Sequence, residues 1–116
     1  EIAIKKTLKN EGAKKTIINV IYVNDKKIKD LNTKYLKHKK PTDVIAFNLS
    51  ENEELLEGEI YISVETARTQ AKEYGVSLTN EILRLAIHGT LHLLGYTDET
   101  KSKKALMHNL ENKYIK

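Results

Sequence analysis

The chain has 116 residues, of which 40% are hydrophobic and 31% charged, with a formal net charge of +4. This composition is typical of one globular domain over residues 1–116 and excludes a disordered chain, while no apolar run reaches the roughly 18 residues that cross a bilayer. Because cysteine is absent, disulfides and cysteine-ligated metal sites are excluded, and a cytoplasmic location is expected.

Charge is distributed unevenly along the chain. Residues 1–50 carry 12 lysines against 5 acidic residues, whereas residues 51–116 carry 8 basic and 11 acidic residues. A basic half of this kind suits a polyanionic partner such as RNA. A lysine-rich solvated surface explains the same pattern without a partner, and charge alone favours that simpler interpretation.

The first half of the chain predicts two strands separated by a helix. Residues 16–24 are β-branched and apolar, which is typical of a strand, and Asn24 or Asp25 can cap the helix that follows. Pro41 then marks a break before a second strand at residues 43–49. Within the helix, apolar side chains recur at helical spacing at Ile28, Leu31, Tyr35 and Leu36.

The next segment predicts a third strand and a second helix. The acidic residues 50–59 are expected to form a loop that leads into a strand at residues 58–63. Gly75 is placed to end the helix after that strand. The apolar face of this helix is predicted to comprise Val64, Ala67, Ala71 and Tyr74.

Two further helices complete the pattern. One begins at Thr79 or Asn80 and ends at Gly95, and because it is apolar almost all round we expect it to be central and buried. A final amphipathic helix covers residues 101–115. The predicted fold class is therefore α+β, with a small sheet packed against several helices.

Two histidines on the predicted central helix carry the strongest functional signal. His88 and His92 are four residues apart, so their imidazoles lie on one helix face, one turn apart. This spacing is the one with which helical histidines bind a single metal ion, although a buried, hydrogen-bonded pair is the structural alternative. Gly95 can turn the chain back so that Asp98 reaches the same ion. We therefore predict one divalent ion, most readily Zn²⁺, bound by His88, His92 and Asp98.

The residue after the first histidine limits the type of reaction that the predicted metal site can catalyse. The pattern resembles the metzincin zinc proteases, in which a glutamate at that place is the general base, but here it is Gly89. Glycine does no acid–base work, and in mid-helix it costs roughly 1 kcal/mol relative to alanine. We expect a strand or a substrate to pack closely against this position.

The order of the motifs is similar to that of the YbeY family of bacterial endoribonucleases, which act in ribosomal RNA maturation and ribosome quality control. The sequence HGTLHLLGYTD at residues 88–98 matches the family's metal motif H-G-x-L-H-L-x-G-Y-D-H. Residues 31–49 match its L-N-x-x-[YF]-R and P-T-D-V-L-S-F motifs, and residues 57–63 match L-G-[DE]-I-x-I-S. The likeness extends over residues 16–100.

The resemblance implies a small mixed sheet, several helices and a zincin-like metal cleft on the central helix. The family's three histidine ligands fall at His88, His92 and position 98, where this chain has Asp98. Aspartate binds zinc through oxygen, but its charge and hardness also admit other divalent ions. Glu99 is a fallback ligand, and His108 is a weaker one, better interpreted as a surface residue.

The resemblance also implies an RNA substrate. The family's arginine after L-N-x-x-Y is Leu36 here, and Lys37, Lys39 and Lys40 are the cations that can replace its contact with RNA phosphate, without bidentate geometry. Single-stranded RNA, including ribosomal RNA, would cross this lysine cluster, and ribosomal small-subunit proteins are expected partners.

Catalytic candidates come from the family motifs alone. Thr42, Asp43 and Glu59 match motif positions, while their structural alternatives are a strand-entry hydroxyl, a turn acceptor and a solvent-facing strand residue. The implied function is a single-strand-specific endoribonuclease that matures the 3′ end of 16S rRNA. A metalloprotease-like hydrolase, a non-catalytic ribosome-associated RNA-binding protein and a purely structural metal are the alternatives.

Overall fold

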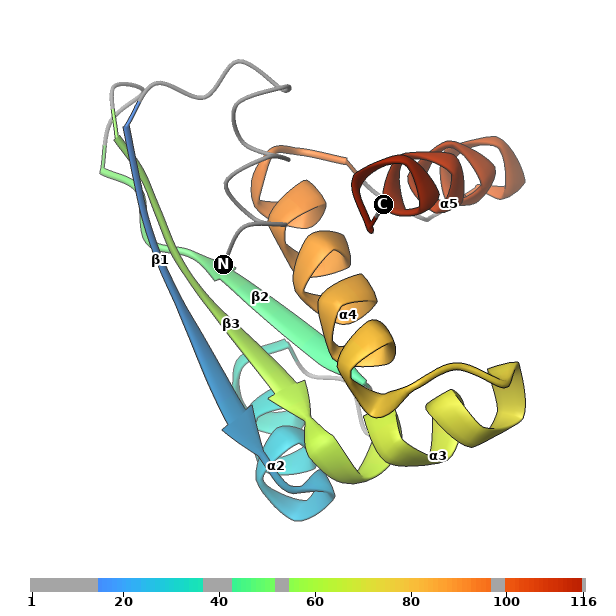
Figure 1. The fold of residues 1–116 in the computed structure, drawn as a ribbon. Helices are drawn as coiled ribbons and strands as arrows, with labels where there is room; N and C mark the ends of the chain where they lie inside the picture. The colour runs from blue at the N-terminus through green and yellow to red at the C-terminus, as the bar shows by residue number, and fades with distance from the viewer. Residues whose placement is uncertain (1–14, 37–42, 52–54, 97–99, 116) are drawn as a thin grey trace.

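The computed structural model describes residues 15–36, 43–51, 55–96 and 100–115 (Figure 1). The described elements follow the chain as β1 (Lys15–Val23), α2 (Asp25–Leu36), β2 (Val44–Asn48), β3 (Leu55–Ser63), α3 (Val64–Tyr74), α4 (Leu78–Leu93) and α5 (Lys101–Ile115). Within these residues, every helix is too short or too polar to cross a membrane.

The three described strands form one mixed sheet in the order β1-β3-β2. β3 lies in the middle, parallel to β1 and antiparallel to β2. α4 crosses one face of this sheet, and α5 lies beyond α4 on the side away from the sheet (Figure 1). The α+β architecture, with a mixed sheet and a central helix, is therefore confirmed.

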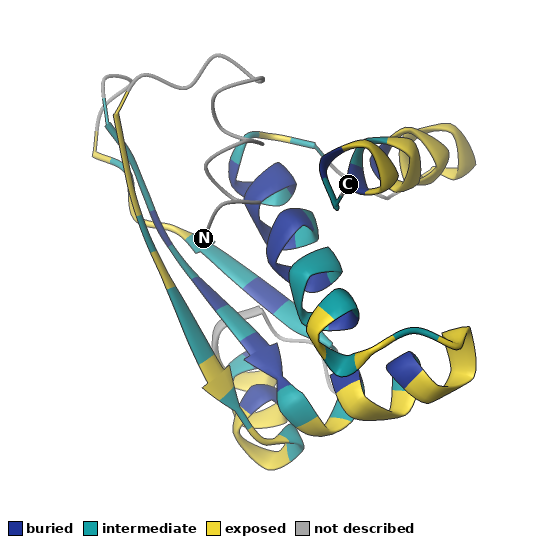
Figure 2. Cartoon of the chain, viewed as in Figure 1, coloured by how far each residue is buried: buried dark blue, intermediate teal, exposed yellow. Residues whose placement is uncertain are grey.

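α4 is central because it is buried on two sides (Figure 2). Its sheet side shares an apolar core with β3 and α3, made of Ile60, Ile62, Ala67, Leu85, Ala86 and Leu93. Its other side packs against α5 through Ile87, Leu91, Met107 and Tyr114. A helix with two partners needs apolar residues around most of its circumference, which explains the sequence pattern.

Two glycines bring α4 unusually close to β3. A Cβ atom added at Gly89 would lie 2.8 Å from Cγ2 of Ile60, and one added at Gly58 would lie 2.7 Å from Cδ1 of Leu93. Each element thus inserts a side chain over a glycine of the other. The predicted close approach at Gly89 is confirmed, and the neighbour is a strand.

Local signals located most helix ends correctly. The side chain of Asn24 accepts a hydrogen bond from the amide of Lys27 at 2.8 Å, as a cap of α2. Gly75 ends α3 in the left-handed conformation, with φ of 66°. The start of α4 differs from expectation: Ser77 is its cap, accepting from the amide of Asn80, and the helix begins at Leu78.

Two expectations were wrong. The predicted loop over residues 50–59 becomes strand from Leu55 onward, because Leu55 and the residues after it pair with β1, starting at Lys15. Long-range pairing here overrides an acidic, loop-like local sequence. Tyr74 does not belong to the buried face of α3, since 60% of its surface is exposed.

The close contact between Gly89 and Ile60 predicts the effect of Gly89→Ala. The new methyl group would overlap Ile60, which costs more than the helix gains from alanine, so the free energy of unfolding should fall by about 1–2 kcal/mol. Urea unfolding of a double-mutant cycle with Ile60→Ala measures this. In the Ile60→Ala background the loss should disappear, and an equal loss in both backgrounds would show that Ile60 is not the cause.

Candidate metal centre

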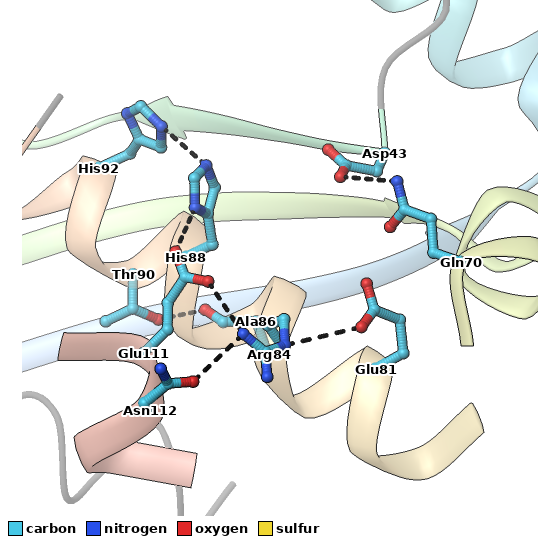
Figure 3. A network of polar contacts seen from close by, with 10 residues as sticks. All are labelled: Asp43, Gln70, Glu81, Arg84, Ala86, His88, Thr90, His92, Glu111 and Asn112. Carbon is cyan, nitrogen blue, oxygen red and sulfur yellow. Dashed lines mark hydrogen bonds and ion pairs between the residues drawn. The ribbon is translucent and has the colours of Figure 1, made fainter. Parts of the chain in front are cut away.

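His88 and His92 lie on one face of α4, with their rings side by side in an edge-on arrangement (Figure 3). Their Nε2 atoms are 3.1 Å apart. Two nitrogens bound to one tetrahedral zinc through bonds of about 2.0–2.1 Å stand about 3.3 Å apart. The pair therefore fits a shared ion with a shift of a few tenths of an ångström, on the atoms that histidine commonly uses to bind metals.

Glu111 from α5 completes the polar environment of this pair. Its Oε2 lies 2.7 Å from Nδ1 of His88, and its surface is only 4% exposed. An ionised carboxylate only accepts hydrogen bonds, so Nδ1 of a neutral His88 carries the proton and Nε2 keeps its lone pair. In the metal-free pair His92 then donates from Nε2 to His88.

Glu111 is not among the site residues predicted from the sequence. A signal was nevertheless present, because Glu111 lies four residues after Met107 and three before Tyr114, both of which are buried. A carboxylate within the apolar stripe of an amphipathic helix needs a partner when it is buried. The stripe predicts burial, but not that the partner is a histidine 23 residues earlier.

Arg84 joins Glu111 to a second buried carboxylate. Its Nη1 lies 3.8 Å from Oε1 of Glu111, and its Nε lies 3.7 Å from Oε1 of Glu81 (Figure 3). Its Nη1 also donates to Asn112 at 3.4 Å. Arg84 is thus the cation shared by two acidic side chains, one on its own helix and one on α5.

Glu81 is the least satisfied member of this network. Only 1% of its surface is exposed, and its Oε1 has no hydrogen-bond partner within the described part of the chain. Burial raises the pKa of Glu81, the charge of Arg84 opposes this rise, and the carboxylates of Asp43 and Glu111 add to it.

A cavity of about 280 Å³ lies beside His88. Its walls also include Arg84, Glu81 and Asp43, and Oδ2 of Asp43 accepts a hydrogen bond from Nε2 of Gln70 at 3.2 Å. The structure therefore brings Asp43, one of the three catalytic candidates, to the cavity that His88 lines.

Glu59 lies on the other face of the sheet. Its neighbours Gly58 and Ile60 point at α4, and side chains alternate along a strand. Its carboxylate accepts from the hydroxyl of Tyr61 at 3.1 Å. The third candidate is thus separated from the histidines by the sheet itself.

Several predicted site residues lie outside the described residues. They are Thr42, Asp98, Glu99 and the lysines Lys37, Lys39 and Lys40. Among the side chains that the structure does describe, no group of three or more histidine, aspartate or glutamate residues gathers to hold a metal. His108 is exposed on α5 and borders the same cavity.

These features define an α+β protein whose buried central helix carries a pair of histidines, of which His88 lines a cavity that also has carboxylates in its walls. The sequence profile of the endoribonuclease YbeY family matches residues 1–116. Proteins called endoribonuclease YbeY from Endomicrobium trichonymphae and Chloroherpeton thalassium are 44% and 41% identical to this chain, cover 100% and 97% of it, and are themselves covered to 81% and 79%. The chain belongs to the endoribonuclease YbeY family.

A solved structure shares this fold. The solution structure of TM1509 from Thermotoga maritima superposes with a TM-score of 0.65 at 31% sequence identity. The match covers 97% of this chain and 74% of the Thermotoga protein.

The buried carboxyl of Glu81 predicts an unusual pH dependence of stability. Its pKa is raised in the folded state, so the folded state holds the proton more tightly than the unfolded state. The unfolding free energy of the wild type should therefore fall relative to Glu81→Gln as the pH rises from about 4 to 7. Urea unfolding at a series of pH values measures the difference. A difference in unfolding free energy that stays constant with pH would contradict a raised pKa of Glu81. A wild type that gains stability relative to the variant as the pH rises would show that this pKa is lowered instead.

Proposed function

We propose that the protein is a zinc-dependent endoribonuclease that cleaves single-stranded RNA. We further propose that it acts in the cytoplasm on the 3′ end of 16S rRNA and in ribosome quality control, in contact with the small ribosomal subunit. Family membership supports RNA hydrolysis. The observation that carries the metal is the pair of Nε2 atoms 3.1 Å apart on α4.

In this proposal His88, His92 and Asp98 hold the ion. When bound, a divalent ion supplies Lewis-acid chemistry at a phosphate. Because two neutral imidazoles and one carboxylate leave a net positive site, zinc bound there would attract the RNA backbone. Lys37, Lys39 and Lys40 would add phosphate contacts that position the strand and weaken with salt.

The general base in this proposal is Asp43. It lines the cavity that His88 also lines, and Gln70 orients its carboxylate through a hydrogen bond of 3.2 Å. Glu59 points away from α4, and Gly89 offers no acid–base group where a zinc protease has its glutamate. The carboxylate of Asp43 would accept a proton from the water that attacks phosphorus, while the P–O bond to the leaving nucleotide breaks and its ribose oxygen takes up a proton from solvent.

Metal content and RNA cleavage should be lost together. Wild type should contain about one zinc per chain, and His92→Ala and Asp98→Ala should lose the metal and cleave single-stranded RNA more than about 100-fold more slowly, since even supporting residues around a metal contribute 10–100-fold. Elemental analysis and a cleavage assay on the same samples measure both. Asp30→Ala is the matched control, because it removes an exposed aspartate on α2 that does not line the cavity.

Other outcomes would change the assignment. Full metal content in Asp98→Ala would move the third ligand elsewhere. Chelator-sensitive cleavage of peptides without cleavage of RNA would favour a metalloprotease. Binding of single-stranded RNA without cleavage at any metal loading would favour a non-catalytic ribosome-associated protein, and undiminished cleavage by metal-free enzyme would contradict the metal dependence.

A further inference from the structure

We infer that Glu111 is a positioning residue of the metal centre, which holds His88 in the tautomer and orientation that leave Nε2 ready to bind the ion. The inference rests on the proposed function for the metal itself. It assigns a role to α5, which otherwise packs on α4 as part of the second apolar core. Figure 3 shows the carboxylate of Glu111 pointing at His88.

The two carboxylate oxygens of Glu111 contact two different side chains. Oε2 lies 2.7 Å from Nδ1 of His88, the short distance of a charge-assisted hydrogen bond. Oε1 faces Arg84 at 3.8 Å. The guanidinium thereby restricts rotation of the carboxylate and keeps Oε2 directed at the imidazole.

Apolar packing fixes the position from which Glu111 acts. Met107 and Tyr114, about one turn to either side of it, are 1% and 2% exposed and pack with Ile87 and Leu91 of α4. Ile87 directly precedes His88. The contact between α4 and α5 therefore sets the distance between the carboxylate and the ring.

The ion pair with Arg84 does not by itself satisfy the buried carboxylate of Glu111. An isolated buried carboxylate is costly, and Arg84 at 3.8 Å is too distant to form a hydrogen bond with it. The hydrogen bond from His88 provides that satisfaction. The same bond makes the imidazole a more basic and better oriented ligand, which is the usual contribution of a carboxylate behind a metal-bound histidine.

Three variants distinguish a role of Glu111 in positioning His88 from a role in stabilising the fold alone. Glu111→Leu removes the acceptor at similar volume, and Glu111→Gln keeps an oxygen acceptor but removes the charge. Glu81→Gln is the matched control, because it removes the other carboxylate that faces Arg84 and does not touch His88. The measurements are the ¹⁵N shifts of the His88 ring in metal-free protein at pH of about 8, where imidazole is neutral, and zinc affinity by competition with a chelator.

We expect Glu111→Leu to differ from the control Glu81→Gln in both the His88 tautomer and the zinc affinity. In wild type and Glu81→Gln, His88 should be a single Nδ1-protonated tautomer. Glu111→Leu should lose this signature and bind zinc roughly 10–100-fold more weakly. Glu111→Gln should keep the tautomer and lose less than about 10-fold in affinity, as rescue by a neutral acceptor.

The inference would be overturned by wild-type tautomer and zinc affinity in Glu111→Leu, with loss of thermal stability alone. An equal effect of Glu81→Gln on His88 would also overturn it, because the cause would then be Arg84. If wild type binds no zinc, the proposed function fails. The tautomer comparison then still decides whether Glu111 controls His88.

Discussion

The close contact between α4 and β3 is the constraint on which the site depends. Gly89 receives Ile60, and Gly58 receives Leu93, so the helix lies so close to the strand that a Cβ atom at either glycine would displace the side chain it meets. With Gly89 facing the sheet, His88 is turned to the side by about 100°, since a helix has 3.6 residues per turn. His92 follows one turn later on the same side. The packing that excludes a side chain at position 89 therefore also directs the histidines.

This constraint has a chemical consequence. In a zinc protease of the same helical pattern the residue after the first histidine is an acidic group that reaches the ion's bound water. Here that position is filled by contact with Ile60, and acid–base work must come from another element. Asp43, which directly precedes β2, lines the same cavity as His88. In the proposed site, one fold element would hold the two histidine ligands, and a different one would offer the carboxylate.

The charged side chains beside the histidines interact with one another in a largely buried environment. Glu81, Arg84, Glu111 and His88 form a continuous polar chain within an otherwise apolar contact between helices. Two carboxylates share one guanidinium, and neither is exposed to water. Such networks are costly unless every member is hydrogen-bonded, and within the described residues Oε1 of Glu81 has an ion pair with Arg84 but no hydrogen bond. The network nevertheless holds Glu111 where the imidazole needs an acceptor.

Much of the fold was predictable because it rests on local signals. Helical periodicity located α4 and α5, Asn24 and Gly75 marked helix ends, and the four-residue spacing of His88 and His92 placed both rings together. What failed depends on contacts distant in sequence. Leu55 is strand because of its pairing with Lys15, and Glu111 meets His88 only after α5 folds back on α4. No period or spacing encodes such contacts. Asp98 and the lysine cluster lie outside the described residues and stay predictions.

A crystal structure of zinc-loaded protein, with data collected on both sides of the zinc absorption edge, tests the central claim most directly. We expect one anomalous peak bound by Nε2 of both His88 and His92, with Glu111 on Nδ1 of His88 and a carboxylate from the segment after Gly95 as a further ligand. Zinc bound through Nδ1, zinc bound by Glu111 itself, or a fully occupied site elsewhere would contradict the claim that α4 and α5 together build the metal centre.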